Sequence, residues 1–197
     1  YEMTSSLVGS EMCIRDSQVL NFNRIEDNED SLLILSRIEL VSFSHSLFSV
    51  YEEDKRLTFL FETNKAKIYA DMDAIKLGAI LDSLLSNAVK FTPDGGSIRL
   101  SLFYREETGL VDICVSDTGS GIPPRDIPYI FQRFFQSPHS GNKEGTGIGL
   151  YLVKTYTELH GGHITGVTSE EGKGTSVGLN IPCLLYTSPS PRDSTSS

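Results

Sequence analysis

The hydrophobic residues between positions 71 and 92 recur at three- and four-residue spacing, which is the pattern of a helix with one buried face. Pro93 follows this run and ends it, because proline has no backbone N–H and cannot continue a helix. The pattern therefore predicts a helix that begins at Asp71. Its apolar stripe consists of Leu77, Ile80, Leu81, Leu84, Leu85 and Ala88.

Weaker versions of the same spacing predict further helices. Ser42 is a candidate N-cap for a helix that runs to about Lys55. Its expected buried face consists of Phe43, Leu47, Val50 and Tyr51. Another helix is predicted from about Leu150 to about His160. Residues 17–26 are predicted to be the last turns of a helix whose start is missing.

Alternating apolar and polar residues predict strands elsewhere. Ile98, Leu100 and Leu102 alternate with polar residues, and residues 110–116 return as a second strand after a turn at 106–109. Shorter strands are predicted at residues 32–35, 57–61, 67–69, 163–168 and 175–181. Helices packed on one side of paired strands give an α/β (α+β) two-layer sandwich with a mixed, mainly antiparallel sheet.

Composition and charge are those of a folded, acidic domain. The chain has 197 residues, of which 39% are hydrophobic, and a formal net charge of −9. We therefore expect no nucleic-acid partner for this domain, because nucleic acids favour basic surfaces. No segment approaches the roughly 20 apolar residues of a membrane-spanning helix. Three cysteines form no disulfide framework, which favours a reducing compartment.

The two ends of the chain, residues 1–17 and 183–197, show neither a hydrophobic period nor a turn pattern. DNA for the C-terminal end can be written so that its reverse complement, in another frame, encodes residues 7–16. This inverted repeat resembles the transposon-end adapters of sequencing libraries. We therefore predict that both ends are adapter-derived and that residues 18–182 belong to a longer protein. Only Cys114 then remains as a natural cysteine, and we expect it to be buried and unreactive.

Four polar or glycine-rich clusters carry the candidate chemistry. Near the end of the strongest helix, Asn87 and Lys90 lie three residues apart and therefore share a face. An amide oxygen can help to hold a hard divalent ion, and a lysine ammonium can contact phosphate. A solvated helix end is the alternative interpretation of this pair.

The second cluster begins with Asp117, which ends an apolar strand and precedes Gly119 and Gly121. A buried carboxylate needs a hydrogen-bond donor. The exocyclic amine of a purine is such a donor, and the glycines would let the backbone approach the ring. An ordinary Asx turn is the alternative.

The third cluster, GTGIGL at residues 145–150, precedes a helix. Free N–H groups and the positive end of the helix dipole suit a phosphate there. The spacing does not fit Gly-x-Gly-x-x-Gly, because Leu150 occupies the place of the third glycine, and it contains no Walker Gly-Lys-Ser/Thr. The fourth cluster, GKGT at residues 172–175, is a turn between strands.

In this order, LLSNAVKFTP, DTGSGIP, IFQRFFQ, GTGIGLYLVK and GKGTS resemble the N, G1, F, G2 and G3 boxes of the ATP-binding domain of sensor histidine kinases. The resemblance implies a Bergerat (GHKL) ATP-binding fold for residues 28–182, with residues 18–27 as the end of the second dimerisation helix. The run at residues 134–149 is most similar to hybrid two-component sensors of Bacteroides-type bacteria.

The resemblance also implies roles for individual residues. Asn87 would coordinate Mg²⁺, Lys90 would contact a phosphate of ATP, and Asp117 would accept from the adenine amine. Further nucleotide contacts would come from Gly119, Gly121, Gly145, Thr146, Gly147, Gly149, Leu150 and Thr175. Residues 136–144 would form a mobile lid. Phe131 and Phe134 match the F box, where we expect both of them to anchor the lid in the core.

The implied reaction is transfer of the ATP γ-phosphoryl group to a histidine on a dimerisation domain, from which a response-regulator receiver domain would take it. The implied parent protein is a homodimer anchored in a membrane, with this domain in the cytoplasm. His45 lacks an acidic neighbour, and His160 and His163 flank a Gly-Gly turn where structural roles are expected. We therefore expect the phosphoacceptor histidine upstream of residue 18.

One departure separates relatives that share the nucleotide fold. Relatives that hydrolyse ATP carry a general-base glutamate one turn before the helix asparagine, where this chain has Ser83. Asp82 is adjacent but about 100° around the helix. The sequence therefore favours phosphoryl transfer over hydrolysis. A regulatory module that binds ATP and transfers nothing is the other alternative, and the presence of Asn87, Lys90 and Asp117 argues against it.

Overall fold

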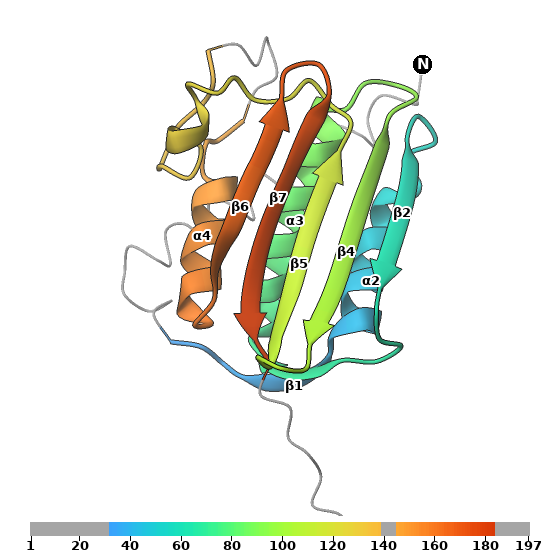
Figure 1. The fold of residues 1–197 in the computed structure, drawn as a ribbon, viewed down its shortest axis with the longest axis vertical. Helices are drawn as coiled ribbons and strands as arrows, with labels where there is room; N and C mark the ends of the chain where they lie inside the picture. The colour runs from blue at the N-terminus through green and yellow to red at the C-terminus, as the bar shows by residue number, and fades with distance from the viewer. Residues whose placement is uncertain (1–31, 139–144, 184–197) are drawn as a thin grey trace, which may run out of the picture.

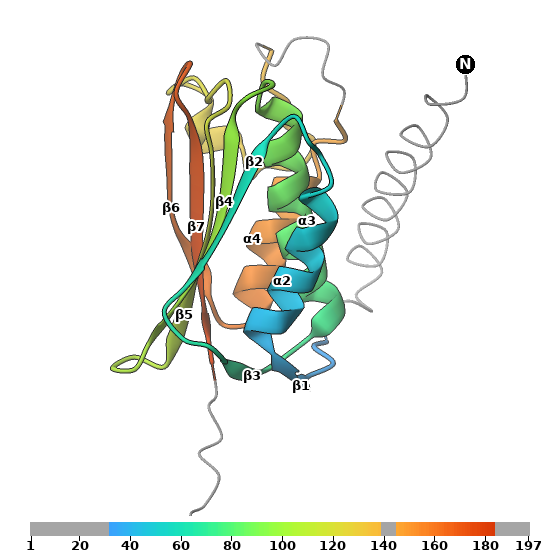
Figure 2. The same cartoon turned by 90° about the vertical axis from the view of Figure 1, so that its right-hand side faces the viewer.

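The computed structural model describes residues 32–138 and 145–183, which form two layers (Figures 1 and 2). One layer is a sheet whose strands, in spatial order, are β2 (Thr58–Thr63), β4 (Ser97–Arg105), β5 (Leu110–Asp117), β7 (Gly174–Pro182) and β6 (His163–Glu170). The other layer consists of α2 (Leu40–Tyr51), α3 (Ala74–Phe91) and α4 (Gly149–Leu159). Strands β2 and β4 are parallel and the other neighbouring pairs are antiparallel, so the predicted sandwich is confirmed.

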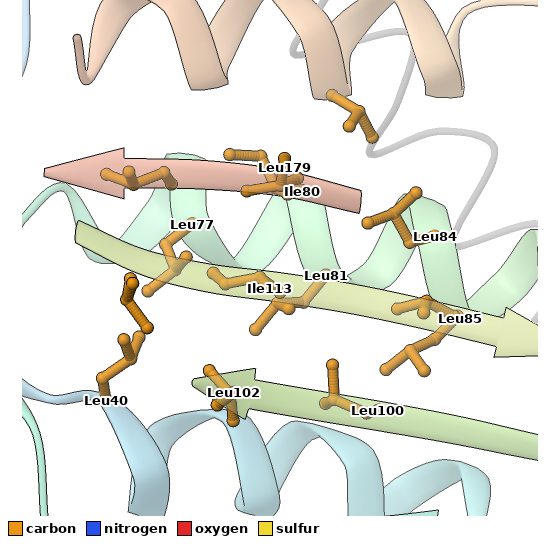
Figure 3. Close-up of a cluster of buried hydrophobic side chains, with 14 of the residues drawn as sticks. Leu40, Leu77, Ile80, Leu81, Leu84, Leu85, Leu100, Leu102, Ile113 and Leu179 are labelled. Carbon is orange, nitrogen blue, oxygen red and sulfur yellow. The ribbon is translucent and has the colours of Figure 1, made fainter. Parts of the chain in front are cut away.

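Helix α3 carries the central part of the core. All six residues of its predicted stripe are buried. Figure 3 shows the leucines and Ile80 of this stripe facing side chains of three strands, namely Leu100 and Leu102 of β4, Ile113 of β5 and Leu179 of β7. Because alternate residues of a strand point to the same face, these apolar positions of β4, β5 and β7 lie on the one face that packs against α3.

Asp73 caps the N-terminus of α3, two residues later than the sequence predicts. Its Oδ1 accepts hydrogen bonds from the backbone N–H groups of Ile75 and Lys76, both at 3.0 Å. Asp71 belongs instead to β3 (Tyr69–Met72), which pairs with β1 (Ser36–Glu39) in a separate two-stranded sheet. At the other end, the N–H of Thr92 donates to the carbonyl of Ala88.

The predicted start of α2 is wrong, because Glu39 rather than Ser42 provides the cap. The Glu39 carboxylate accepts from the N–H groups of Val41 and Ser42, and also from that of Ile68 across the small sheet. The helix ends at Tyr51, four residues before the predicted end.

The predicted buried face of α2 is also partly wrong. Val50 is 67% exposed, whereas Leu40, Ser44 and Phe48 are fully buried. Ser42 does not begin the helix, because the Glu39 carboxylate three residues earlier accepts from the N–H groups of Val41 and of Ser42 itself.

The strand boundaries differ most from the prediction at β1 and β3. Residues 32–35 form no strand, and the strand begins at Ser36, where the partner β3 becomes available. Strand β2 begins one residue later than predicted and β3 two residues later. The strand expected around Ile98, Leu100 and Leu102 is confirmed and spans Ser97–Arg105. The strands expected at 110–116, 163–168 and 175–181 are confirmed within one to two residues.

Cys114 is less buried than the sequence predicts. Cys114 lies on the sheet face opposite the helices, half-buried rather than in the core, with its Sγ 3.2 Å from the Oγ of Ser176. Cys183 is buried, its N–H donates to the carbonyl of Gly109, and burial raises the pKa of its thiol to about 11.

The rest of the predicted adapter-derived ends, and the predicted helix at 17–26, lie outside the described residues. Among the helices described, none is long and apolar enough to cross a membrane.

Replacing Ile80 by alanine is expected to lower the free energy of unfolding by about 2–5 kcal/mol, because it leaves a cavity under the sheet. Ile75→Ala on the same helix is the matched control, since Ile75 is 67% exposed and Ile80 is fully buried. The control should change the free energy by less than about 0.5 kcal/mol. Urea unfolding followed by circular dichroism measures both, and equal effects of the two variants would contradict the packing described for α3.

Candidate functional site

The carboxylate of Asp117 is held in one orientation at the end of β5. It lies opposite Thr175 of β7, and its Oδ1 accepts from the N–H groups of Gly119 at 2.8 Å and Thr175 at 3.2 Å. In the part of the chain that the structure describes, no donor reaches Oδ2. Burial raises the pKa of Asp117, and the two N–H groups offset this only in part. Asp117 therefore presents an oriented, partly desolvated oxygen to a ligand that can donate a hydrogen bond.

The loop after Asp117 packs on the end of α3. A Cβ on Gly119 would lie 2.6 Å from the carbonyl oxygen of Phe91, the last residue of α3, and the N–H of Ser120 donates to the same carbonyl. Gly121 has φ +74°, and a Cβ there would lie 2.1 Å from the carbonyl oxygen of Glu170. The glycines therefore let this loop lie against both the end of α3 and the end of β6, next to Asp117.

Asn87 and Lys90 lie on the last turns of α3, at this same end of the sandwich. Both side chains are half-buried. The Nζ of Lys90 lies 4.9 Å from the centroid of the Phe91 ring and 2.9 Å from the place of a Cβ on Gly145. The structure thus brings the Asn87/Lys90 pair together with the glycine-rich segment that precedes α4.

The glycine-rich segment leads directly into α4. Gly149 and Leu150 are the first two residues of that helix, and the Oγ1 of Thr146 accepts from the N–H of Ile148. Within the described residues, no side-chain hydrogen bond caps the helix N-terminus. First-turn N–H groups without an intrahelical partner bind anions well, and Gly145, four residues before this helix, lies beside the Nζ of Lys90. Leu150 itself is half-buried and packs against the core, so its contribution is its backbone.

Gly147 holds this segment against the preceding loop. It has φ +68°, its carbonyl accepts from the N–H of Phe134 at 2.9 Å, and a Cβ there would lie 2.6 Å from the carbonyl carbon of Phe134. Phe134 itself has φ 61°, an uncommon conformation for a residue with a side chain. The glycine-rich segment and the loop at Phe134 are therefore in direct backbone contact.

Residues 72–184 match the family model described as "Histidine kinase-, DNA gyrase B-, and HSP90-like ATPase". The chain belongs to this family. Sensor histidine kinase WalK of Bacillus subtilis is 32% identical over 160 residues, which cover 79% of this chain and 26% of WalK. Sensor histidine kinase TmoS of Ectopseudomonas mendocina is 42% identical over 117 residues, which cover 58% of this chain and 12% of TmoS.

Solved structures agree with this assignment. The catalytic domain of histidine kinase ThkA, nucleotide-free, superposes with a TM-score of 0.65 at 25% identity, covering 76% of this chain and 95% of that domain. Full-length ShkA in complex with AMPPNP gives a TM-score of 0.73 at 25% identity and covers 89% of this chain and 36% of that protein. This chain is thus an ATP-binding catalytic domain of the sensor histidine kinase type, with the GHKL fold.

Within this histidine kinase domain, the F-box segment is placed only in part as the sequence suggests. Phe131 is half-buried against the core, as expected, but the expectation for Phe134 is wrong, because its side chain is 58% exposed. The φ of 61° turns the chain at Phe134 so that its backbone, rather than its ring, makes the contact with Gly147. Of the predicted lid at 136–144, residues 139–144 lie outside the described residues.

Ser169 is a site residue that the sequence does not single out. Its Oγ accepts from the N–H of Ile122 at 2.7 Å and hydrogen-bonds to the Oγ1 of Thr175 at 2.8 Å. It therefore ties the G1 loop to the G3 turn beside Asp117. Ser169 stands opposite Thr175 in the β6–β7 register, and neither this pairing nor the contact with Ile122, 47 residues away, is marked by the sequence pattern.

The position of the general base in ATP-hydrolysing relatives is occupied by Ser83, which is 2% exposed. The neighbouring Asp82 points to α2, where its Oδ1 accepts from the hydroxyl of Tyr51. Burial and this carboxylate raise the pKa of Tyr51 well above its usual value, so the hydroxyl stays a donor. Asp82 is therefore engaged away from Asn87, as the helix geometry predicts.

Asp117→Asn is expected to weaken ATP binding at least about tenfold, because a charge-assisted hydrogen bond is replaced by an amide that donates where an acceptor is needed. The fold should remain, since the asparagine oxygen can still accept from Gly119 and Thr175. At neutral pH the domain should be no less stable. A raised pKa means that burial disfavours the ionised carboxylate relative to the unfolded chain, and the substitution removes that charge.

Calorimetric titration with Mg²⁺·ATP and thermal unfolding measure the two effects. Asp112→Asn is the matched control, because Asp112 lies on the same strand and pairs with Arg105 away from the site. It should bind ATP like the wild type. An Asp117→Asn variant that keeps its ATP affinity would contradict the role given to Asp117.

Proposed function

We propose that this domain binds Mg²⁺·ATP and transfers the γ-phosphoryl group to a histidine on a dimerisation domain of the parent protein. The observation that carries the proposal is that Asp117, the end of α3 and the uncapped start of α4 meet at one end of the sandwich. Asp117 suits a purine base, which donates from its exocyclic amine. The end of α3 and the start of α4 suit a triphosphate.

Asp117 binds the adenine base of the nucleotide. Its Oδ2 accepts from the exocyclic amine, while Gly119 and Thr175 hold Oδ1. Thr175 is fixed in turn by Ser169, so the acceptor does not have to reorient when the base arrives. Gly119 and Gly121 keep side chains out of the surface against which the ring lies.

The phosphate end is bound by Lys90 and by backbone N–H groups of the segment from Gly145 to Leu150. The amide oxygen of Asn87 is a hard donor of the kind that Mg²⁺ takes, and it lies one helical turn from Lys90. When bound, Mg²⁺ neutralises charge on the phosphates. The magnesium site fits the donor set of this chain, since Mg²⁺ uses few protein ligands and takes the rest from phosphates and water.

The chemistry that follows favours transfer over hydrolysis. With Ser83 one turn before Asn87, and with Asp82 bonded to Tyr51, no carboxylate of α3 is placed to deprotonate water there. The γ-phosphoryl group remains for a histidine nitrogen, which forms the N–P bond while the bond to the β-phosphate oxygen breaks and ADP leaves. This domain positions the phosphates and stabilises charge; the nucleophile comes from the dimerisation domain.

The partners of the parent protein follow from the same proposal. The dimerisation and phosphoacceptor domain makes the parent a homodimer, and a response-regulator receiver domain takes the phosphoryl group. ThkA was crystallised in complex with the response regulator TrrA, and its structure superposes on this chain with a TM-score of 0.69 at 20% identity, which supports the fold alone. We propose that the parent is anchored in a membrane with this domain in the cytoplasm.

A chimera in which the dimerisation domain of WalK precedes residue 28 tests the proposal. With Mg²⁺ and γ-labelled ATP, it should acquire an acid-labile phosphoryl group, and it should do so faster than it releases inorganic phosphate. Asp117→Asn should reduce the labelling at least about tenfold, in line with the loss of ATP binding.

The control is the same chimera with the WalK phosphoacceptor histidine replaced by glutamine, which should stay unlabelled. ATP binding without labelling would favour the regulatory module over the kinase. Release of phosphate faster than labelling, equal in the glutamine control, would favour a hydrolase.

A further inference from the structure

The chain enters the domain through a segment whose side chains do not hold it in place. Leu32 is 74% exposed, Ile34 is 76% exposed and Leu35 is 52% exposed, and none of them lies in a strand or helix. Their backbone is nevertheless bonded to α3. The N–H of Ile34 donates to the Oδ2 of Asp73 at 3.0 Å, and the carbonyl of Leu32 accepts from the Nζ of Lys76 at 3.2 Å.

The two groups that hold this segment are a buried ion pair. Asp73 is 3% exposed and Lys76 is 5% exposed, and their charged atoms are 3.4 Å apart. Burial alone would raise the pKa of Asp73, but the hydrogen bonds from Ile34 and Lys76 and the charge of Lys76 outweigh it, and the pKa is lowered. A buried pair of charges is costly unless each is fully hydrogen-bonded, and here the exposed segment supplies part of that bonding.

The two carboxylate oxygens of Asp73 accept hydrogen bonds from different groups. Oδ1 caps α3 through the N–H groups of Ile75 and Lys76, which is all that an N-cap requires. Oδ2 accepts from Ile34 and from the Nζ of Lys76. The capping role alone therefore explains neither the hydrogen bonds that Oδ2 accepts nor the burial of Lys76 beside it.

Helix α4 is tied to the same point. The Nδ1 of His160 lies 2.7 Å from the carbonyl oxygen of Tyr156, which can only accept, so Nδ1 carries the proton and Nε2 accepts from the N–H of Asp73. The Nζ of Lys76 lies 5.6 Å from the centroid of the Tyr156 ring. We call Asp73, Lys76 and His160 the entry clamp.

The entry clamp lies at the opposite end of both helices from the nucleotide site. Asp73 is at the start of α3 and Asn87 near its end, about 21 Å away along the helix. His160 follows the last residue of α4, whose first residue, Gly149, belongs to the phosphate-binding segment. Figure 2 shows the two helices side by side along the sheet, with β1 and β3 at the clamp end. The incoming chain is thus joined to the two rigid elements that carry the nucleotide.

We propose that Asp73 and Lys76 are positioning residues for phosphoryl transfer, because they fix the chain that leads to the dimerisation domain onto the helices that hold ATP. This inference rests on the proposed function. A firm attachment at residues 32–34 limits the orientations in which the γ-phosphoryl group can meet the histidine. A loose one leaves the domain on a flexible tether and lowers the fraction of productive encounters.

Asp73→Ser tests the clamp directly, because serine is a good N-cap but has no second oxygen for Ile34. In this chain, amide hydrogen exchange of Ile34 should accelerate at least about tenfold in the variant, while exchange at Leu81 in the middle of α3 stays unchanged. Lys76→Met should also accelerate exchange in this segment. Lys154→Met, which removes an exposed lysine of α4 paired with Glu158, is the matched control and should have no effect. Equal exchange of Ile34 in the wild type and Asp73→Ser would overturn the clamp.

The chimera with the WalK dimerisation domain tests the positioning role. Asp73→Ser should lower the transfer rate at saturating ATP about tenfold and leave the KM for ATP within about twofold, because the nucleotide site is remote. When the dimerisation domain is supplied as a separate chain, the variant and the wild type should transfer at equal rates, since no connection exists to be clamped. A purely structural defect would lower the rate in both formats.

Two results separate this inference from the proposed function. If the wild-type chimera transfers phosphoryl and Asp73→Ser transfers equally fast, the positioning role is overturned and the kinase function stands. If the wild-type chimera binds ATP and transfers nothing, the proposed function itself fails, and with it the positioning role.

Discussion

Burial of one face of α3 against the sheet is the constraint on which the rest of this structure depends. Its stripe of six apolar residues is removed from water, and each fully buried leucine or isoleucine contributes about 1.5–3 kcal/mol. Because α3 contacts α2, α4 and β5, its position determines that of the whole helical layer. Rotation of α3 about its axis would expose this apolar face to water, so the packing fixes the positions of both ends of the helix.

The candidate site is a consequence of that placement. The C-terminal carbonyl of α3, on Phe91, receives the loop after Asp117, and only glycine at position 119 lets the loop come that close. Asp117 is then fixed by β-sheet register opposite Thr175, and Lys90 reaches the segment before α4. Catalysis by preorganised groups requires this arrangement, because reorienting them in the presence of the nucleotide would cost free energy.

Local periodicity explains what the sequence predicts well. The stripe of α3 and the alternation of β4 and β5 are visible because these elements bury a regular face, and the glycine clusters are visible because their spacing matches a family. Glu39 as a cap, the strand at residues 36–39 and the bonding of Ser169 are not visible. Each depends on a partner far away in the chain, such as Ile68, β3 or Ile122, which only the folded structure brings near. Asp73 combines both cases, since its role as a cap is local and its contact with Ile34 is 39 residues apart. The predicted adapter-derived ends and the predicted Bacteroides-type origin stay predictions.

The most direct test of the account is a crystal structure of this domain with Mg²⁺ and AMPPNP. We expect the adenine amine within hydrogen-bonding distance of the Oδ2 of Asp117, the phosphates beside Lys90 and the start of α4, and the metal bound to the amide oxygen of Asn87. A nucleotide whose base lies away from Asp117, or whose phosphates do not contact the end of α3, would contradict it.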